Sequence, residues 1–413
     1  MAAPTEGARS RRSGSTRRQF LLGGAVAGVG AVAAVGADIA LNRPSTDSTA
    51  VSTPMNGTET VPFFGAHQAG VDTAAQAHGV FVALDLHDDT DRTALTRLMR
   101  ILTDDAARLT QGRPALADSE PELALSPARL TVTFGFGPGF VARAGGTPPA
   151  WLAPLPAFRV DRLQPEFSDG DLLLQIAGDD PLTVAHALRM LLKDARGFAG
   201  VRWTQQGFRR AYGTERPGTT MRNLFGQVDG TANPEPGTAD FDRIVWTEEG
   251  WLSGGTGMVI RRIRMDLDKW DRLDRSGRDA SVGRTLANGA PLTGTKEFDE
   301  PDFEAKTAIG FPVIPAFAHI RRARGDGAER IFRRGYNYDE RPSGAEVSES
   351  GLLFVSFQAD IERQFTPMQK RLDELDLLNE WTVPIGSAVF AVPPGCAEGG
   401  FIGETLLTGG VGA

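Results

Sequence analysis

The chain has 413 residues, of which 41% are apolar and 23% charged, which is the composition of a soluble globular protein. This length is enough for two domains with cores of ordinary size. The formal net charge is −8, and residues 1–40 contribute +3 through five Arg against Glu6 and Asp38, so the remaining chain carries −11. An acidic chain is a poor match for nucleic acid or an anionic membrane surface as its main partner, whereas small neutral or cationic substrates remain open.

Cysteine and histidine are scarce in the sequence. The single cysteine, Cys396, excludes an internal disulfide, an iron–sulfur cluster held by cysteines, and a covalent CxxCH haem attachment. The five histidines form no HExxH motif and no close pair, which argues against a multi-histidine zinc site.

The N-terminal segment has the features of an export signal. Paired Arg17 and Arg18 stand before Phe20-Leu21 and an uncharged Gly/Ala/Val-rich run that ends near Ala37, which resembles the twin-arginine signal. We expect residues 1–40 to be this signal peptide and residues 41–60, rich in Ser, Thr, Pro and Asn, to be a disordered tether. An uncleaved anchor is the alternative, because the run is near the minimum length that spans a membrane.

Export by the twin-arginine route would place the mature protein in the periplasm, the cell envelope or the medium, with no stable membrane span after cleavage. That route is associated with proteins that fold, often around a cofactor, before they cross. The signal therefore favours a cofactor-binding protein.

The next segments, in residues 61–216, are predicted in the order strand, helix, strand, strand, helix, strand. They are Gly79–Leu86, Asp91–Leu109, Arg129–Phe136, Asp171–Ala177, Pro181–Ala195 and Val201–Phe208. This order is the ferredoxin-like split βαβ pattern.

The second half, residues 217–413, repeats the pattern less clearly. Strands are predicted at Met258–Leu267, Ile331–Tyr338, Leu352–Ala359 and Ala388–Val392, and helices at Leu267–Leu273, Ser281–Ala287 and Ile361–Leu377. A cluster of Gly, Pro and Thr in 213–224 marks the boundary between the halves. The sequence thus predicts an α+β protein of two ferredoxin-like domains, with antiparallel sheets and peripheral helices.

Three segments carry the chemistry. The first is the GxxDG loop in 225–234, where Gly226 and Gly230 allow tight turns on either side of Asp229, although Asp-Gly is also common in ordinary turns. The second is Ala318-His319-Ile320-Arg321-Arg322, in which a lone histidine precedes guanidinium groups. The third is Ile331-Phe332-Arg333-Arg334-Gly335-Tyr336-Asn337-Tyr338, where strand alternation directs only one of the two arginines inward.

These three segments, in this order and spacing, resemble the dye-decolourising peroxidases, and in particular the exported subgroup that includes deferrochelatase-type proteins. The segments at 62–70, 261–264 and 351–358 resemble the family as well, so the resemblance covers about residues 60 to 407. It implies a non-covalent haem b peroxidase that reduces hydrogen peroxide and oxidises an organic (dye or phenolic) or metal donor through a ferryl intermediate.

The resemblance also assigns roles by position. It makes His319 the proximal ligand of the haem iron, with Asp360 accepting the other ring N–H. It makes Asp229 the distal acid–base group and Arg333 the group that stabilises developing negative charge. The remaining residues expected to bind the cofactor are Leu352 and Phe354 as pocket walls, Arg321 toward a propionate, and Gly230 and Thr231 in the GxxDG loop.

Two other readings of the same pocket remain open at this stage. One is a deferrochelatase that releases iron from haem with iron-uptake partners, and the other is a haem-binding or delivery protein without turnover. The sequence leaves open whether the chain forms a homo-oligomer. Tyr336 and Tyr338 are candidate relays for oxidising bulky dyes at the surface, although aromatic side chains are core residues by default.

Overall fold

A computed structural model describes residues 55–342 and 348–409. The expected signal peptide and most of the expected tether lie outside these residues. These described residues form one compact unit. Among the described residues, no helix combines the length and the apolar character that crossing a bilayer requires.

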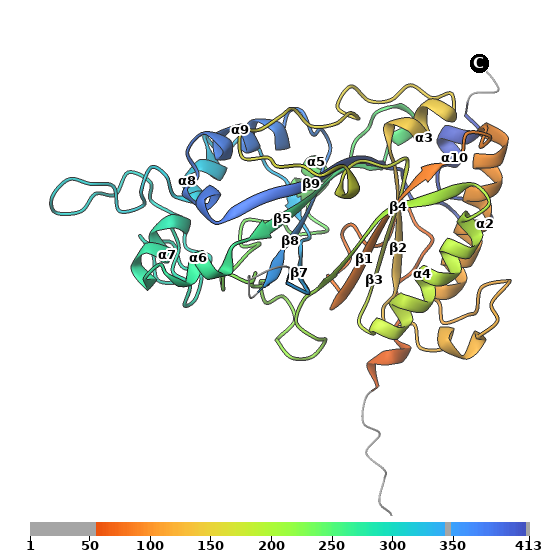
Figure 1. The fold of residues 1–413 in the computed structure, drawn as a ribbon, viewed down its shortest axis with the longest axis horizontal. Coiled ribbons are helices and arrows are strands. Elements are labelled where there is room, and N and C mark those ends of the chain that lie inside the picture. The colour runs from red at the N-terminus through yellow and green to blue at the C-terminus, as the bar shows by residue number, and fades with distance from the viewer. Residues whose placement is uncertain (1–54, 343–347, 410–413) are drawn as a thin grey trace, which may run out of the picture. The chain divides into compact units, whose positions relative to one another are not determined.

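Four strands and two long helices make up the first half. The strands are β1 (His78–Leu86), β2 (Thr131–Phe136), β3 (Leu172–Gly178) and β4 (Ala199–Phe208), and the helices are α2 (Arg92–Thr110) and α4 (Pro181–Ala195). Each long helix begins at an aspartate, because Asp91 accepts the N–H of Ala94 and Asp180 accepts that of Thr183. In Figure 1, α2 and α4 lie beside the strands of this half. The strands pair antiparallel in the order β2-β3-β1-β4.

The second half contributes five strands: β5 (Thr256–Met265), β6 (Phe332–Arg333), β7 (Tyr336–Glu340), β8 (Glu349–Gln358) and β9 (Thr382–Val392). The order is β9-β5-β8-β7, and β6 pairs with β8 in line with β7. The helices here are α5 (Ala239–Val245), α6 (Leu267–Asp271), α7 (Arg275–Val282), α8 (His319–Arg324) and α9 (Phe365–Leu375). In Figure 1, α6 to α9 gather near the ends of β5, β8 and β9.

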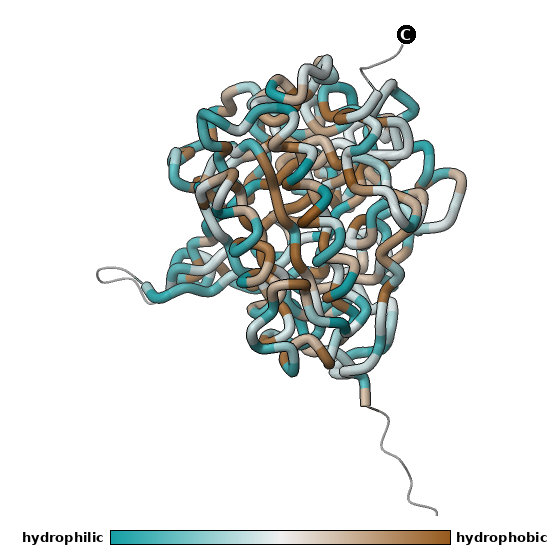
Figure 2. Tube along the Cα trace, turned by 90° about the vertical axis from the view of Figure 1, so that its right-hand side faces the viewer, coloured by the Kyte–Doolittle hydropathy of each residue, from teal (hydrophilic) through white to brown (hydrophobic). Residues whose placement is uncertain are grey.

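The two halves join in one sheet. Phe136 of β2 pairs with Ala391 of β9, and Phe208 of β4 pairs with Asn337 of β7. Because β5 also pairs with β8, eight strands close into a barrel-like ring, with β6 attached to β8. Antiparallel strands with peripheral helices are confirmed, but the prediction of separate sheets was wrong: the described strands form a single nine-stranded sheet. Figure 2 shows the hydrophobic stretches of the chain toward the middle of the molecule and the hydrophilic stretches mainly at its edges.

Several elements differ from the prediction. The strand expected at Ile331–Tyr338 is interrupted at Arg334 and Gly335, although the N–H of Arg334 still donates to the carbonyl of Val355. The helix expected at Ser281–Ala287 lies earlier, at Arg275–Val282, where Asp274 accepts the N–H of Gly277 and Gly283, at φ 87°, ends it. The short helices α3 (Pro138–Arg143), α5, α8 and α10 (Glu404–Leu407) were not predicted, because four to seven residues display too little periodicity.

Candidate active site

His319 is held in place by a carboxylate that follows α9. The residue opens α8, and its Nδ1 donates to Oδ2 of Asp376 at 2.6 Å. Asp376 is buried, and its other oxygen accepts the N–H of Leu378 at 3.0 Å. Burial by itself lowers the pKa of His319, but the charge of Asp376 and its hydrogen bond outweigh burial and raise that pKa above its ordinary value. With Nδ1 occupied, the lone pair of Nε2 is left for a ligand.

The prediction that Asp360 accepts the other ring N–H of His319 was wrong. Asp360 lies in the turn between β8 and α9, where it accepts the N–H of Arg363 at 2.9 Å and pairs with the guanidinium of that residue at 3.4 Å. The chain then runs through α9, which packs against α8, and so returns Asp376 to the imidazole. The carboxylate that contacts His319 therefore follows helix α9 and does not come from the end of strand β8.

Asp229 and Arg333 form an ion pair, although they are 104 residues apart. Oδ1 of Asp229 accepts from Nη1 of Arg333 at 2.6 Å, and both side chains are partly buried. Asn223, which lies outside the predicted motifs, donates to Oδ2 of Asp229 at 3.4 Å. The loop around Asp229 turns at Gly226 (φ 79°) and Gly230 (φ 136°), where a side chain would be strained.

The backbone of Arg333 is fixed by Asn233. The side-chain amide of Asn233 donates to the carbonyl of Arg333 at 2.7 Å and accepts the N–H of the same residue at 3.0 Å. Arg334 turns the other way: it is 2% exposed and donates to the carbonyl of Thr73 and to Gln76. As strand alternation requires, only one of the two arginines reaches the loop of Asp229.

The two polar pairs lie within electrostatic range of each other. The positive charge of Arg333 opposes protonation of His319, and the negative charge of Asp229 favours it. The His319 side chain keeps 31% of its surface accessible, so the protein does not fill the space beside the ring. Leu352 and Phe354 are only half-buried in the middle of β8, whereas Leu353 and Val355 between and beside them are buried.

Arg321 and Thr231, which were also predicted to bind the cofactor, form hydrogen bonds to other groups of the protein. Nε and Nη2 of Arg321 donate to the carbonyl of Ile314 at 3.2 and 2.9 Å, and Nη2 also donates to that of Phe303. Thr231 donates to Glu297 at 2.9 Å. A propionate contact of Arg321 and cofactor contacts of Gly230 and Thr231 stay predictions.

Tyr336 and Tyr338 do not lie at the surface. Their exposures are 0% and 1%, and within the described residues neither hydroxyl has a hydrogen-bond partner. Burial is the main reason that the pKa of Tyr338 is raised to about 12. A bulky donor therefore cannot touch either tyrosine directly, and a role of the two tyrosines as relays stays a prediction.

The chain matches known proteins over nearly its whole length. Residues 68–209 match the family model of the N-terminal part of Dyp-type peroxidases, and residues 220–397 match that of the C-terminal part. A dye-decolorizing peroxidase of Thermobifida fusca is 37% identical, with 97% of this chain and 99% of that protein covered. A deferrochelatase of Yersinia pestis is 37% identical, with 84% of each chain covered.

Solved structures agree with these matches. A DyP-type peroxidase from Cellulomonas bogoriensis is 55% identical, with 86% of this chain and 99% of that chain covered and a TM-score of 0.83. DtpA from Streptomyces lividans, in its ferric form, is 41% identical, with 86% and 100% covered and a TM-score of 0.83. The chain belongs to the DyP-type peroxidase family.

Proposed function

We propose that the peroxidase activity of this chain depends on a non-covalently bound haem b, for which His319 would be the iron ligand, with Asp229 and Arg333 as the residues that would act on peroxide. The proposal rests on two hydrogen-bonded pairs of side chains, His319–Asp376 and Asp229–Arg333. In each pair the nitrogen and the oxygen lie 2.6 Å apart. One similar protein is named a deferrochelatase and another a DyP-type peroxidase. A more distant neighbour, DypB from Rhodococcus jostii, was solved in complex with heme.

The residues fit such a group. An imidazole whose Nδ1 is bound to a carboxylate presents Nε2 with a fixed orientation and increased basicity, which is the arrangement of metal-ligating histidines. Leu352 and Phe354 offer apolar surface in the middle of a sheet, as a flat macrocycle needs. Cys396 stands alone in the sequence, so any haem is held without a CxxCH linkage.

When bound, the haem supplies the redox chemistry of peroxide reduction. The chain's own residues supply proton handling and charge. Asp229 takes the proton from one peroxide oxygen and returns it to the leaving oxygen. Arg333, already bound to Asp229, stabilises the negative charge that develops as the O–O bond breaks. Asp376 holds the His319 ring and Asn233 holds the Arg333 backbone, so neither group has to reorganise during reaction.

The absorption spectrum of the haem-reconstituted protein tests this assignment. We expect a Soret band that shifts with one equivalent of peroxide, and we expect His319→Ala to lose that band or show a changed one. A wild-type spectrum without a Soret band after haem is supplied would refute the assignment of the cofactor. An unchanged spectrum of His319→Ala would refute the assignment of the ligand.

Deferrochelatase activity is the second candidate, because a relative at 37% identity has that name. The two activities use the same pocket but give different products. Accumulation of metal-free protoporphyrin with bound haem supports iron release, whereas oxidised donor with intact haem supports the peroxidase alone. Iron-uptake partners belong only to the second candidate.

We also propose that the chain is exported by the twin-arginine route to the periplasm, cell envelope or medium, with residues 41–60 as a tether. Arg17 and Arg18 support this proposal. Replacing both arginines with lysine should retain the precursor in the cytoplasm, and fractionation measures this.

The strand orders β2-β3-β1-β4 and β9-β5-β8-β7 support a ferredoxin-like fold for each half, 61–216 and 217–413.

A further inference from the structure

A narrow arm, residues 303–314, projects from the second half of the chain between α7 and α8. It reverses direction at Gly310, whose φ is 88°. The N–H of Thr307 donates to the carbonyl of Phe311 at 2.8 Å, and the N–H of Phe311 donates to the hydroxyl of Thr307 at 3.2 Å. The arm is thus a short hairpin with a defined turn. Figure 1 shows this part of the chain extending beyond α7 and α8, away from the sheet.

The tip of the arm, residues 306–312, is apolar and exposed. Ile309 is 81% exposed and Phe311 is 66% exposed, and the other residues of the tip are exposed as well. Single exposed apolar side chains are common, but two of them together at the end of a projecting hairpin indicate a contact surface. Because a two-stranded hairpin is only marginally stable by itself, a contact at the tip would also stabilise its shape.

The base of the arm is held by Arg321 of α8. Nη2 of Arg321 donates to the carbonyl of Ile314 on the returning leg at 2.9 Å, and also to the carbonyl of Phe303 on the outgoing leg. The guanidinium lies 5.0 Å from the centroid of the Phe303 ring. One side chain thus joins both legs to the helix that begins at His319.

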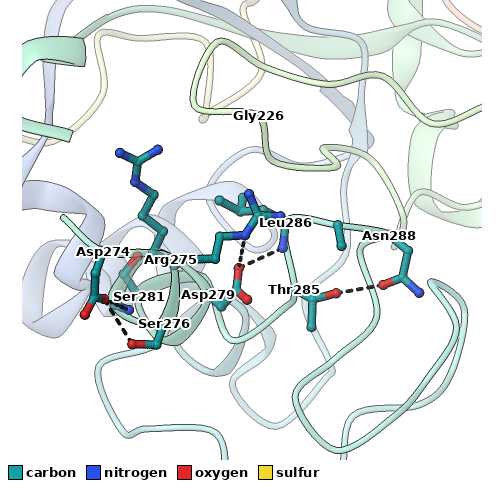
Figure 3. A network of polar contacts seen from close by, with 12 residues as sticks. Gly226, Asp274, Arg275, Ser276, Asp279, Ser281, Thr285, Leu286 and Asn288 are labelled. Carbon is teal, nitrogen blue, oxygen red and sulfur yellow. Dashed lines mark hydrogen bonds and ion pairs between the residues drawn. The ribbon is translucent and has the colours of Figure 1, made fainter. Parts of the chain in front are cut away.

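The segment that leads into the arm is fixed as well. The side-chain oxygen of Asn288 accepts the hydroxyl of Thr285 at 2.7 Å, and its nitrogen donates to the carbonyl of Thr295 at 2.9 Å. Figure 3 shows the first of these contacts, beside α7. Since the arm is held at both of its ends, it loses less conformational entropy on binding than a free loop does.

A cavity of about 600 Å³ lies next to the base of the arm. Phe317, three residues after the returning leg, is one of its walls, and the carbonyl of Phe317 accepts the N–H of Leu377 at 3.0 Å. Leu375 at the end of α9 is 50% exposed. The apolar residues that line the cavity are Val160, Phe317, Leu375, Leu377 and Val383. A hollow of this size and lining is suited to apolar side chains.

The charges around the cavity complement those of the arm. Glu304 and Lys306 are both exposed on the outgoing leg. Among the residues that line the cavity, Arg159 has a side chain that is 71% exposed, and Glu374 one that is 65% exposed. Each of these two has an ion pair within its own chain, but exposed pairs contribute little to stability. Both remain available to opposite charges of an arm laid across the cavity.

We propose that the arm of one molecule docks in this cavity of a second copy, and that the arm of the second copy docks in the cavity of the first. The arm and the cavity are neighbours in the fold, so one twofold axis beside them forms both contacts and closes the assembly as a dimer. Ile309 and Phe311 enter the hollow against Leu375. Asp376 also lines the cavity, so the tip covers the carboxylate that orients His319.

A second copy is favoured over a lipid bilayer as the contact of the tip. Four carboxylates precede the tip, and their negative charge opposes an anionic membrane surface. These residues are Asp299, Glu300, Asp302 and Glu304. A second copy, in contrast, supplies an apolar hollow with charges of both signs around it.

Sedimentation velocity of the haem-loaded protein tests the dimer. We expect the wild type to be a dimer at about 50 μM, and Ile309→Asp/Phe311→Asp to raise the Kd of the dimer at least about 100-fold, because the docked tip would bury two carboxylates. Leu375→Glu changes the cavity side and should act in the same way. Leu116→Asp/Leu125→Asp, at positions that are 73% and 61% exposed outside the arm and the cavity, should remain dimeric.

Peroxide-dependent oxidation of hydroquinone, a neutral donor, and the thermal unfolding temperature show whether each variant is folded. The substituted side chains are exposed in the single chain, so we expect both readouts to persist. The sedimenting mass is measured independently of turnover. A protein that fails to oxidise hydroquinone but is dimeric through its arm would contradict the proposed function and not this inference.

Disulfide cross-linking tests the docked position. Ile309→Cys and Leu375→Cys, prepared separately and then mixed, should form a linked heterodimer when copper–phenanthroline oxidises the two thiols. Either variant alone should stay unlinked, because each tip faces the cavity of the other molecule and not the other tip. The natural thiol of Cys396 is buried and should not react. Electrophoresis without reductant separates the linked and unlinked chains.

Three results would overturn the proposal. The first is a wild type that is monomeric at about 50 μM, or a dimer that the tip and cavity variants leave intact. The second is a disulfide in Ile309→Cys alone, which would show that the two tips meet each other. The third is a monomeric wild type that cosediments with phosphatidylglycerol vesicles while Ile309→Asp/Phe311→Asp does not, which would assign the tip to a membrane surface.

Discussion

Asp376 approaches His319 from 57 residues further along the chain, and the hydrogen bond between Oδ2 and Nδ1 measures 2.6 Å. The contact depends on α9 packing against α8, since the aspartate follows the last turn of α9. The ligand histidine is thus oriented by the fold of the second half and not by its own short helix.

Replacing Asp376 with Asn should remove the charge that makes the imidazole a strong donor. We expect hydroquinone turnover to fall by about 10–100-fold, the usual effect of losing the carboxylate partner of a metal-ligating histidine. The Asp360→Asn variant is the matched control, because Asp360 pairs with Arg363 and should leave turnover unchanged. If the two variants lost activity equally, the orienting role of Asp376 would be disproved. Haem content, measured beside turnover, separates weaker binding from slower reaction.

Asp229→Asn and Arg333→Leu should each retain haem but react slowly with peroxide. We expect the rate of the spectral change after mixing to fall by about 10²–10⁴-fold for Asp229→Asn, since its general acid–base function is lost. For Arg333→Leu a loss of about 10²–10³-fold is expected from the missing charge. Glu235→Gln, an exposed carboxylate six residues after Asp229, serves as control in stopped-flow measurements. Rates equal to the wild type would show that neither group takes part.

Local signals made much of the fold predictable from the sequence. The range Pro181–Ala195 was predicted with both ends correct, because Asp180 caps the helix, Pro181 suits its first turn, and apolar residues follow at helical spacing. The strands of the first half were also found, since runs of buried apolar residues end at turn residues. Local patterns could not show that strands of the first half pair with strands of the second half. The pairings Phe136–Ala391 and Phe208–Asn337 join segments more than a hundred residues apart.

The candidate site, like the fold, was predictable only where its residues lie in local sequence motifs. His319, Asp229 and Arg333 lie in motifs that the sequence displays, and the structure brings the latter two into contact. Asp376 and Asn233 are recognised only by what they touch, and an isolated Asp or Asn carries no such signal in the sequence. Asn223 is a partial exception, because an Asn shortly before Gly226 is typical of a side chain that organises a turn.

Asn233→Ala should affect both stability and peroxide reactivity. Two hydrogen bonds to the Arg333 backbone would be lost, at 2.7 and 3.0 Å, and the free energy of unfolding should drop by roughly 1–3 kcal/mol. Because Arg333 would then sit less firmly against Asp229, the peroxide reaction should slow as well. Denaturant titration and stopped flow give the two values. A loss of stability with an unchanged peroxide rate would limit Asn233 to a structural role.

Two carboxylates face each other between α2 and α4, far along the chain from the active-site motifs. Burial and then the charge of Asp105 raise the pKa of Asp194 to about 7, and within the described residues Oδ2 of Asp194 has no hydrogen-bond partner. In the unfolded chain Asp194 titrates at its ordinary value, near 3.8. Between these two values the folded state holds the proton more tightly, so stability is greatest at the acidic end and is lost as pH rises toward 7.

Asp194→Asn removes this titration while keeping the size of the side chain. The difference in unfolding temperature between variant and wild type should therefore increase in favour of the variant from pH 5 to pH 8 and then level off. Asp89→Asn, at an exposed position before α2, should show no such trend. A constant difference across this range would mean that Asp194 is ionised in the folded protein throughout, so that the charge of Asp105 must be offset by the nearby cation of Lys193.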